Sequence, residues 1–323
     1  MKKFVTIAAG LLAAMIVSAA EFVNPTKVVT QDFSPELAKK LRIRQAWTTN
    51  DTHGDIYIIT TPDKKVTLVD CGWGDRANST KKYYETVLFP ALAEQNIRHI
   101  DRIIITHPHG DHIGGLPHLL RKKSISVGEV CWSYLDPAML KKTGPSSIKY
   151  QNEVIELCRQ RNIPVRDLKD GEVIHFGKGV TATVLTTGFR KAGRSNWLNN
   201  QSIVFQLKYG TFTMLFTGDC GFEEEKYLLK KYPAATLKSD VLKLGHHGGA
   251  GSTGEKFLQT VAPAVAIAPI PDWLAADKRG QRVVKLMQSK KIPYFMSWQY
   301  PLLSVVTDGK TFEMINIVYP KQK

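Results

Sequence analysis

Residues 106–115 read THPHGDHIGG, a stretch in which three histidines and one aspartate fall within six positions. Imidazole and carboxylate groups are ligands that transition metals bind in proteins. His107 and His109 are two residues apart, so in extended chain their side chains point the same way. Asp111 and His112 follow a glycine, where the chain can turn. The spacing therefore predicts a site for two metal ions, one held by His107 and His109 and the other by Asp111 and His112.

Two later stretches show the same pattern, in which an apolar strand stops at residues that can bind metal. MLFTGD ends at Asp219, and VLKLGHHGG carries His246 and His247 after its strand. Taken alone, Asp219 is typical of a helix N-cap and the histidine pair of a turn. Together with the first motif, all three are better explained as parts of one centre.

The elements that must position these loops alternate along the chain as strand-like and helix-like segments. Four strand-like stretches stand in a row over residues 171–219, and helix-like segments flank them. Adjacent strands mixed with helices predict two sheets with helices on the outside, not one doubly wound sheet. Residues 21–44 are expected to be an irregular or helical lead-in. No linker divides the remainder, so residues 45–323 are treated as one domain.

The first twenty residues differ in composition from the rest. MKKFVTIAAGLLAAMIVSAA has two lysines, an apolar run and then small residues, which is typical of a secretory signal peptide. The apolar run is shorter than the roughly 20 residues that span a bilayer. Residues 1–20 are therefore expected to be cleaved, leaving a periplasmic or secreted chain with no membrane anchor. No C-x-x-C spacing links the four cysteines, which in an exported chain could pair as disulfides: Cys71, Cys131, Cys158 and Cys220.

The formal net charge is +15, which favours anionic partners such as nucleic acid or an anionic cell-wall polymer. Many exported proteins are basic without such a partner, so charge alone leaves both interpretations open. The loop FRKAGRSNW adds Arg190, Lys191 and Arg194 as candidate substrate contacts, with Trp197 beside them for stacking. A solvated loop could have the same composition.

With these motifs in this order, the chain resembles the metallo-β-lactamase-fold superfamily, and within it the hydrolase domain of the competence protein ComEC/Rec2 group. The similarity covers roughly residues 45–315. It is carried by NDTHGDIYIIT, LVDCGWGD, ITHPHGDHIGGL, NNQSIVFQLKYG, FTGD and LKLGHHGG. The resemblance implies an α+β fold, the αβ/βα sandwich of two mixed β-sheets with helices on the outside.

The resemblance also implies roles for the motif residues. Either His246 or His247 would complete the second metal site, with His247 favoured, and the other would face the scissile group. Asp219 would bridge both ions, and the expected catalytic residues are Asp111, Asp219 and His246. One or two ions, Zn²⁺ first and Mn²⁺ as an alternative, would be bound by this set: His107, His109, Asp111, His112, Asp219 and His247.

One departure from the superfamily pattern concerns the first metal. Members often place a further histidine between the first motif and the bridging aspartate, but Thr186 and Thr187 stand in that stretch here. The first ion would then have three protein ligands plus water, which suggests a weaker first site or single occupancy. Asp55 and Asp70 would orient the motif histidines.

Two metal ions bridged by an aspartate lower the pKa of a shared water and stabilise charge on attacking and leaving oxygens. No Gly-x-Ser-x-Gly elbow supports a serine route. The predicted function is an exported metal-dependent hydrolase: a phosphodiesterase acting on DNA, RNA or a cell-envelope phosphodiester through a metal-activated hydroxide. The alternatives are a β-lactam or lactone hydrolase, and a non-catalytic binding module on the same scaffold.

Overall fold

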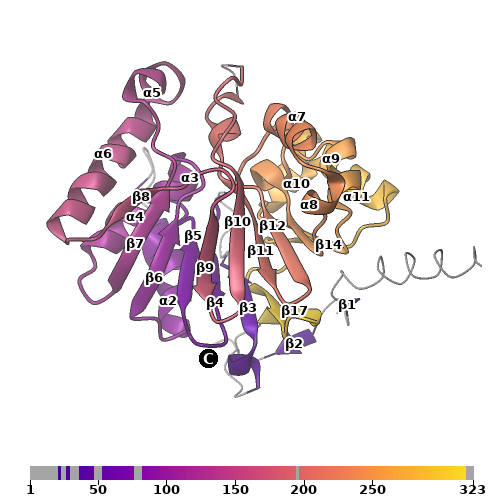
Figure 1. Cartoon of the computed structure of the whole chain (residues 1–323), viewed down its shortest axis with the longest axis horizontal. Coiled ribbons are helices and arrows are strands. Elements are labelled where there is room, and N and C mark those ends of the chain that lie inside the picture. Colours follow the sequence, from indigo (N-terminus) through magenta and orange to yellow (C-terminus); the bar gives the residue numbers. More distant parts are fainter. Residues whose placement is uncertain are drawn as a thin grey trace, which may run out of the picture.

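Two mixed β-sheets packed face to face form the centre of the protein (Figure 1), in a computed structural model that describes residues 21–22, 27–29, 36–46, 53–75, 82–193 and 196–317. Helices lie on the outer side of each sheet. This arrangement confirms the predicted α+β sandwich. The expected signal peptide over residues 1–20 lies outside the described residues. Among those described, no helix combines the length and the apolar character needed to cross a membrane.

The first sheet contains the amino-terminal strands and both carboxy-terminal ones. Its members are β1 (Glu21–Phe22), β2 (Lys27–Val29), β3 (Leu41–Gln45), β4 (Tyr57–Thr60), β5 (Val66–Val69), β6 (His99–Ile104), β7 (Ser126–Trp132), β8 (Val165–Asp167), β16 (Leu303–Thr307) and β17 (Thr311–Ile317). Their order is β1-β17-β16-β3-β4-β5-β6-β7-β8, and β2 pairs with β17. The expected lead-in over residues 21–44 differs from this structure, because β1, β2 and most of β3 come from it and pair within the sheet.

The second sheet is built from the middle of the chain. Its strands are β9 (Val173–Gly177), β10 (Val180–Thr186), β11 (Val204–Tyr209), β12 (Phe212–Phe216), β13 (Val241–Lys243), β14 (Val265–Ala268) and β15 (Tyr294–Met296). They lie in the order β15-β14-β13-β12-β11-β10-β9. Strands β9 to β12 pair antiparallel, whereas β12 to β15 pair in parallel.

Two groups of helices cover the outer faces (Figure 1). On the first sheet they are α2 (Phe89–Glu94), which continues a π-helical turn (Tyr84–Leu88), α3 (Gly110–Ile113), α4 (Leu116–Arg121), α5 (Pro137–Thr143) and α6 (Pro145–Gln160). On the second sheet they are α7 (Phe222–Lys231), α8 (Ala234–Leu237), α9 (Glu255–Val261), α10 (Asp272–Ala276) and α11 (Lys278–Ser289). Except for α5, whose Leu140 packs with Trp197 and Leu198, the helices of each group share a buried apolar cluster with their sheet. Each helix layer is therefore held by apolar burial.

The core between the sheets is aromatic and aliphatic. Phe205 on β11 stacks on Phe216 of β12, with ring centroids 4.8 Å apart and 15° between the planes. Tyr57 of the first sheet meets Phe216 edge to face at 5.4 Å. Because alternate residues of a strand point to opposite faces, these rings fill the space between sheets while their neighbours face the helices.

The candidate ligands follow strands that end at one edge of this sandwich. Asp70 follows β5 and His107 follows β6, and these two strands pair in parallel. Asp219 and His247 follow β12 and β13, which are also parallel neighbours. Parallel neighbours present their carboxyl ends together, so loops distant in sequence meet where the ligands are needed.

The loop that follows β13 is tied to α7 by a buried carboxylate. Glu225 accepts hydrogen bonds from the backbone N–H groups of Thr253 and Gly254, the latter at 2.8 Å. Burial raises the pKa of Glu225 to about 7. Glu225 therefore keeps its proton up to a higher pH in the folded protein than in the unfolded chain.

We predict that Phe205→Ala destabilises the protein by about 3–5 kcal/mol, because it leaves a cavity between the sheets. The free energy of unfolding in urea, followed by circular dichroism, measures this loss. Phe205→Leu is the matched control and should cost clearly less, since it fills most of the volume. An alanine variant within about 1 kcal/mol of wild type would show that this ring does not hold the sheets together.

We predict that Glu225 lowers stability as pH rises between its unfolded value of 4.5 and its folded value of about 7. The folded state binds more protons than the unfolded state in this window, so the free energy of unfolding falls, by up to about 1.36 kcal/mol per pH unit. Urea unfolding at about pH 5 and about pH 8 compares wild type with Glu225→Gln. The variant should lose this part of the pH dependence. Equal slopes in the two proteins would contradict the assignment.

Candidate metal centre

The loop after β6 that carries the first motif is held by close glycine packing. A Cβ on Gly114 would lie 2.3 Å from the carbonyl oxygen of Gly110 and 2.5 Å from the backbone nitrogen of Gly74. A Cβ on Gly74 would lie 2.2 Å from the carbonyl oxygen of Gly114. Since such contacts are impossible for a side chain, the glycine after the motif lets the loop before residue 75 pack against α3.

The first group of candidate ligands consists of His107, His109 and Asp219, each of which offers an atom within 4.8 Å of the others. His107 Nε2 lies 2.8 Å from His109 Nδ1 and 3.7 Å from Asp219 Oδ2. His107 and Asp219 are buried, and His109 is half-buried. These are the residues expected at the first metal position.

The second group shares Asp219 with the first. His112 Nε2 lies 3.2 Å from Asp219 Oδ2. His247 Nε2 lies 3.4 Å from the same oxygen and 3.1 Å from Asp111 Oδ2. The structure thus brings Asp111, His112 and His247 together on one side of Asp219, whose carboxylate lies between the two groups.

Two further aspartates fix the orientation of the imidazole rings. The Nδ1 of His112 donates to Asp70 Oδ2 at 2.7 Å, and that of His247 donates to Asp55 Oδ1 at 3.1 Å. Asp70 is itself held by the N–H and hydroxyl of Thr106. With the proton on Nδ1, each neutral ring turns the lone pair of Nε2 toward the carboxylates.

A cation fits this arrangement, because the Nε2 atoms of two histidines and several carboxylate oxygens lie close together. Asp219 Oδ1 is buried and has no hydrogen-bond partner among the described residues. Burial lowers the pKa of His112, but the carboxylates of Asp219, Asp70 and Asp111 outweigh it and hold the pKa well above its usual value. Metal binding would replace the protons that the histidines retain in the metal-free protein.

A buried lysine, absent from the sequence-based set, supports the same carboxylates. Lys243 Nζ lies 2.6 Å from Asp55 Oδ2, 3.6 Å from Asp219 Oδ1 and 2.5 Å from the carbonyl oxygen of Gly218. Its only sequence signal is a cation within the apolar strand VLKLG, whose side chain is 1% exposed here.

The two histidines after β13 differ in position. His247 is buried among the carboxylates, whereas His246 lies at the cleft, with its Nε2 3.2 Å from the side-chain nitrogen of Asn199. Both have positive φ, 45° and 56°, in the left-handed region that residues other than glycine rarely adopt. Such strain in successive residues is typical of functional sites.

A cleft of about 680 Å³ opens over the centre. His53, another residue that the sequence analysis did not single out, lies at its edge with Nε2 3.1 Å from Asp111 Oδ2. It could join Asp111 and His247 as a ligand. Its sequence signal is its place two residues before Asp55. Trp73, Lys149 and Tyr150 also line the cleft.

The expected substrate loop is arranged differently from the sequence interpretation. Trp197 is only 4% exposed and donates to the carbonyl oxygen of Arg190 at 3.2 Å, so it offers no face for stacking. The guanidinium of Arg190 donates to Gln201 Oε1 at 2.9 Å and to Ser133 Oγ at 2.5 Å. Arg190 and Lys191 line a cleft other than the metal cleft. Arg194 lies outside the described residues.

The stretch without the further histidine contributes no ligand to either group. Thr186 is buried, and its hydroxyl accepts a hydrogen bond from the N–H of Gly188 at 3.0 Å. Instead, Ser202 Oγ lies 3.4 Å from His107 Nδ1 and accepts from the backbone N–H of Asp219 at 2.9 Å. The four cysteines are buried and free, so the disulfide considered from sequence is absent.

Comparisons with known proteins agree with this geometry. Residues 49–270 match the protein family described as the Metallo-beta-lactamase superfamily. ComE operon protein 3 of Bacillus subtilis is 30% identical over 208 residues, 64% of this chain and 25% of that protein. Ribonuclease Z of Bacillus cereus is 34% identical over 73 residues, 20% of this chain and 24% of that protein. The chain thus spans about a quarter of the length of these curated relatives.

Among solved structures, Igni18, a metallo hydrolase of Ignicoccus hospitalis, aligns with a TM-score of 0.47 and 13% identity over 83% of this chain and 99% of that one. The family match covers more than half of the chain, and the buried histidines and aspartates of its motifs converge on one centre. The chain therefore belongs to the metallo-beta-lactamase superfamily, and its histidines and aspartates form a candidate metal site.

Proposed function

We propose that this protein is an exported phosphodiesterase that binds two metal ions, on either side of Asp219. One observation carries the proposal: two groups of buried ligands share a single carboxylate at the floor of an open cleft. A shared carboxylate can hold two ions at the short spacing that two-metal hydrolases use. The first ion would be held by His107, His109 and Asp219. The second would be held by Asp111, His112, Asp219 and His247.

The bound ions would lower the pKa of a water molecule and would stabilise negative charge on the phosphate oxygens. The protein's own residues prepare that chemistry. Asp55 and Asp70 hold the rings of His247 and His112 so that Nε2 faces the centre. His246 lies at the cleft, where its ring can contact a substrate oxygen. Nitrogen and carboxylate donors suit Zn²⁺ first and Mn²⁺ as an alternative.

A phosphodiester is the substrate class that Lys149 at the cleft and the net charge of the chain favour. Lys149 and Tyr150 line the cleft over the ligands, and they offer a cation for phosphate and an aromatic ring beside it. The net charge of +15 would attract a polyanion. A ribonuclease among the relatives supports the same class. The composition of residues 1–20 supports export, which would bring the enzyme to nucleic acid or cell-envelope polymers outside the cytoplasm.

We predict a graded loss of metal affinity in three aspartate variants. Asp70→Ala should weaken binding by about 10–100-fold, because it frees the ring of His112. Asp219→Ala should lose more, since both ions share this carboxylate. Asp136→Ala, which removes an exposed helix cap, is the matched control and should bind one to two ions like wild type. Competition with a chelator, followed by elemental analysis, measures all three.

Equal metal content in the Asp219→Ala and Asp136→Ala proteins would refute the assigned ligands. Circular dichroism on each variant separates loss of a ligand from loss of the fold.

We predict that the metal-loaded protein hydrolyses bis(p-nitrophenyl) phosphate and leaves nitrocefin intact. Asp219→Ala should lose several powers of ten in rate, with each 1.36 kcal/mol of lost stabilisation costing about tenfold. Lys149→Ala should raise KM several-fold with a smaller change in kcat, because it contacts the substrate away from the reacting atoms. Initial rates with both chromogenic substrates provide the measurement.

Turnover of nitrocefin without turnover of any phosphodiester would make the protein a β-lactam hydrolase. Bound metal without turnover of either substrate would instead favour the binding module.

A further inference from the structure

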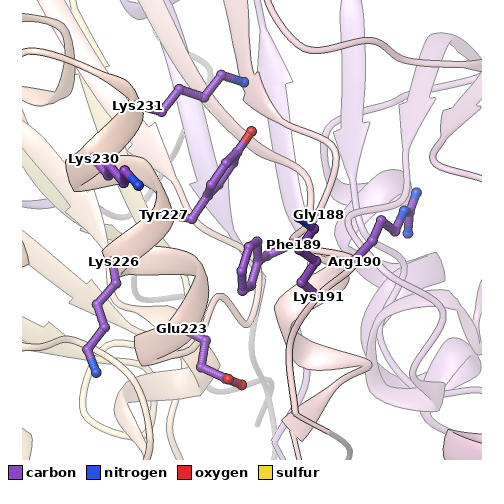
Figure 2. A pocket seen from close by; sticks show the side chains of 9 residues that line it. All are labelled: Gly188, Phe189, Arg190, Lys191, Glu223, Lys226, Tyr227, Lys230 and Lys231. Atoms are coloured by element: carbon purple, nitrogen blue, oxygen red, sulfur yellow. The ribbon is translucent and has the colours of Figure 1, made fainter.

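A second cleft, of about 860 Å³, lies between the loop after β10 and helix α7 (Figure 2). We call it the basic cleft, and its lining contains one acid and several cations: Gly188, Phe189, Arg190, Lys191, Glu223, Lys226, Tyr227, Lys230 and Lys231. In Figure 2 the rings of Phe189 and Tyr227 lie side by side in the middle, the lysines and Glu223 of α7 are spread along one side of them, and the side chain of Arg190 points away. None of the motifs of the metal centre lies here.

The cations of the basic cleft are in excess of its acids. Lys226 and Lys230 are exposed and stand one helical turn apart on α7, where like charges repel. Among the described residues, no acidic side chain pairs with either of them or with Lys191, whereas Lys231 is paired with Asp170 at 2.5 Å. An anion in the cleft would relieve this repulsion.

Two aromatic rings form a stacking surface next to these cations. Phe189 and Tyr227 lie with centroids 5.3 Å apart and 24° between their planes, and both are half-buried. The backbone N–H of Phe189 donates to the carbonyl oxygen of Asn200 at 2.6 Å, which holds the ring in place. The ammonium of Lys231 lies 5.3 Å from the Tyr227 ring centroid. Proteins that bind single-stranded nucleic acid place aromatic side chains, on which bases stack, beside cations that follow the phosphates. Phe189 and Tyr227 cover one face of each other, so a base would stack on the outer side of this pair.

The same short segment joins the basic cleft to the metal centre. Asn200, which accepts from Phe189, is the neighbour of Asn199, whose side chain contacts His246. On the other side, the N–H of Gly193 donates to Glu223 of α7 at 2.9 Å. The loop that carries Phe189 is therefore tied, through Asn200, to the segment whose Asn199 contacts His246 at the metal cleft.

We infer that the basic cleft binds a segment of single-stranded nucleic acid beside the metal centre. Lys191, Lys226 and Lys230 contact its phosphates, and bases stack on Phe189 and Tyr227. The inference rests on the proposed phosphodiesterase function for its meaning, but the binding itself needs no turnover. A polyanion without bases would contact the lysines but would not stack on the aromatic rings. The presence of the rings therefore favours nucleic acid over a cell-wall phosphodiester.

Fluorescence anisotropy tests this with a short labelled oligothymidylate and the full chain in EDTA, so that no cleavage occurs. Lys226→Gln combined with Lys230→Gln should weaken binding about 20-fold at about 0.1 M salt and reduce the salt slope by about 0.7 per lysine. Lys256→Gln combined with Lys285→Gln, on α9 and α11, changes the net charge equally and should bind like wild type. Equal effects of the two pairs would overturn the site.

Tyr227→Leu tests the stacking, since it keeps apolar volume and removes the ring face. It should weaken oligothymidylate about tenfold and leave inorganic polyphosphate binding unchanged. An equal response to both ligands would overturn nucleic acid in favour of a general polyanion. Photocrosslinking of bromodeoxyuridine oligonucleotide to wild type, which needs no variant to fold, should label the peptides of Phe189 or Tyr227. Labelling that misses both of these peptides would contradict the inference.

Hydrolysis of bis(p-nitrophenyl) phosphate by wild type is measured separately and decides the proposed function. Specific binding without turnover would uphold the cleft and refute the phosphodiesterase. Turnover, together with oligonucleotide binding that the Lys226, Lys230 and Tyr227 variants do not weaken, would support the phosphodiesterase and refute the basic cleft as a binding site.

Discussion

Negative charge concentrated below the surface is the constraint on which the rest of this structure depends. The carboxylates of Asp55, Asp111 and Asp219 all contact the ring of His247, and each is almost fully buried. Burying unpaired carboxylates costs several kcal/mol each, so the cluster has to contain compensating positive charge. Lys243 supplies one cation, and the geometry of the histidines indicates that metal ions supply the rest.

That requirement explains features of the fold that look unrelated in sequence. Two pairs of parallel strands, β5 with β6 and β12 with β13, bring their ends to one edge so that four loops can share the charge. The glycine contacts around α3 let the first motif approach the strand-end loop that carries Asp70. His246 and His247 are held in left-handed backbone. The carboxylate of Glu225 accepts hydrogen bonds from the backbone of the same loop. Burial of this carboxylate raises its pKa to about 7.

Much of the centre could be predicted because its signals are local. His107, His109, Asp111 and His112 are close in sequence, and strand ends mark Asp219. Lys243 and His53 could not be found in that way, because their roles depend on contacts with carboxylates far along the chain. Those contacts exist only after the two sheets have packed.

The less successful sequence predictions failed for related reasons. The composition of FRKAGRSNW says nothing about which side chains the fold covers, and Trp197 is buried beneath its own loop. Stacking was expected at Trp197. Instead, Phe189 of the same loop lies against Tyr227 of α7, more than thirty residues away in sequence. The strands β1 to β3 are short and depend on pairing with β16 and β17, so their local pattern is too weak to predict.

Anomalous diffraction from crystals grown with Zn²⁺ or Mn²⁺ would test the central claim most directly. Two peaks about 3.5–4 Å apart, the spacing of two-metal hydrolases, are expected on either side of the Asp219 carboxylate. One should contact His107 and His109, and the other should contact Asp111, His112 and His247. A fully metal-loaded crystal with no peak beside Asp219, or with ions only elsewhere on the protein, would contradict the account.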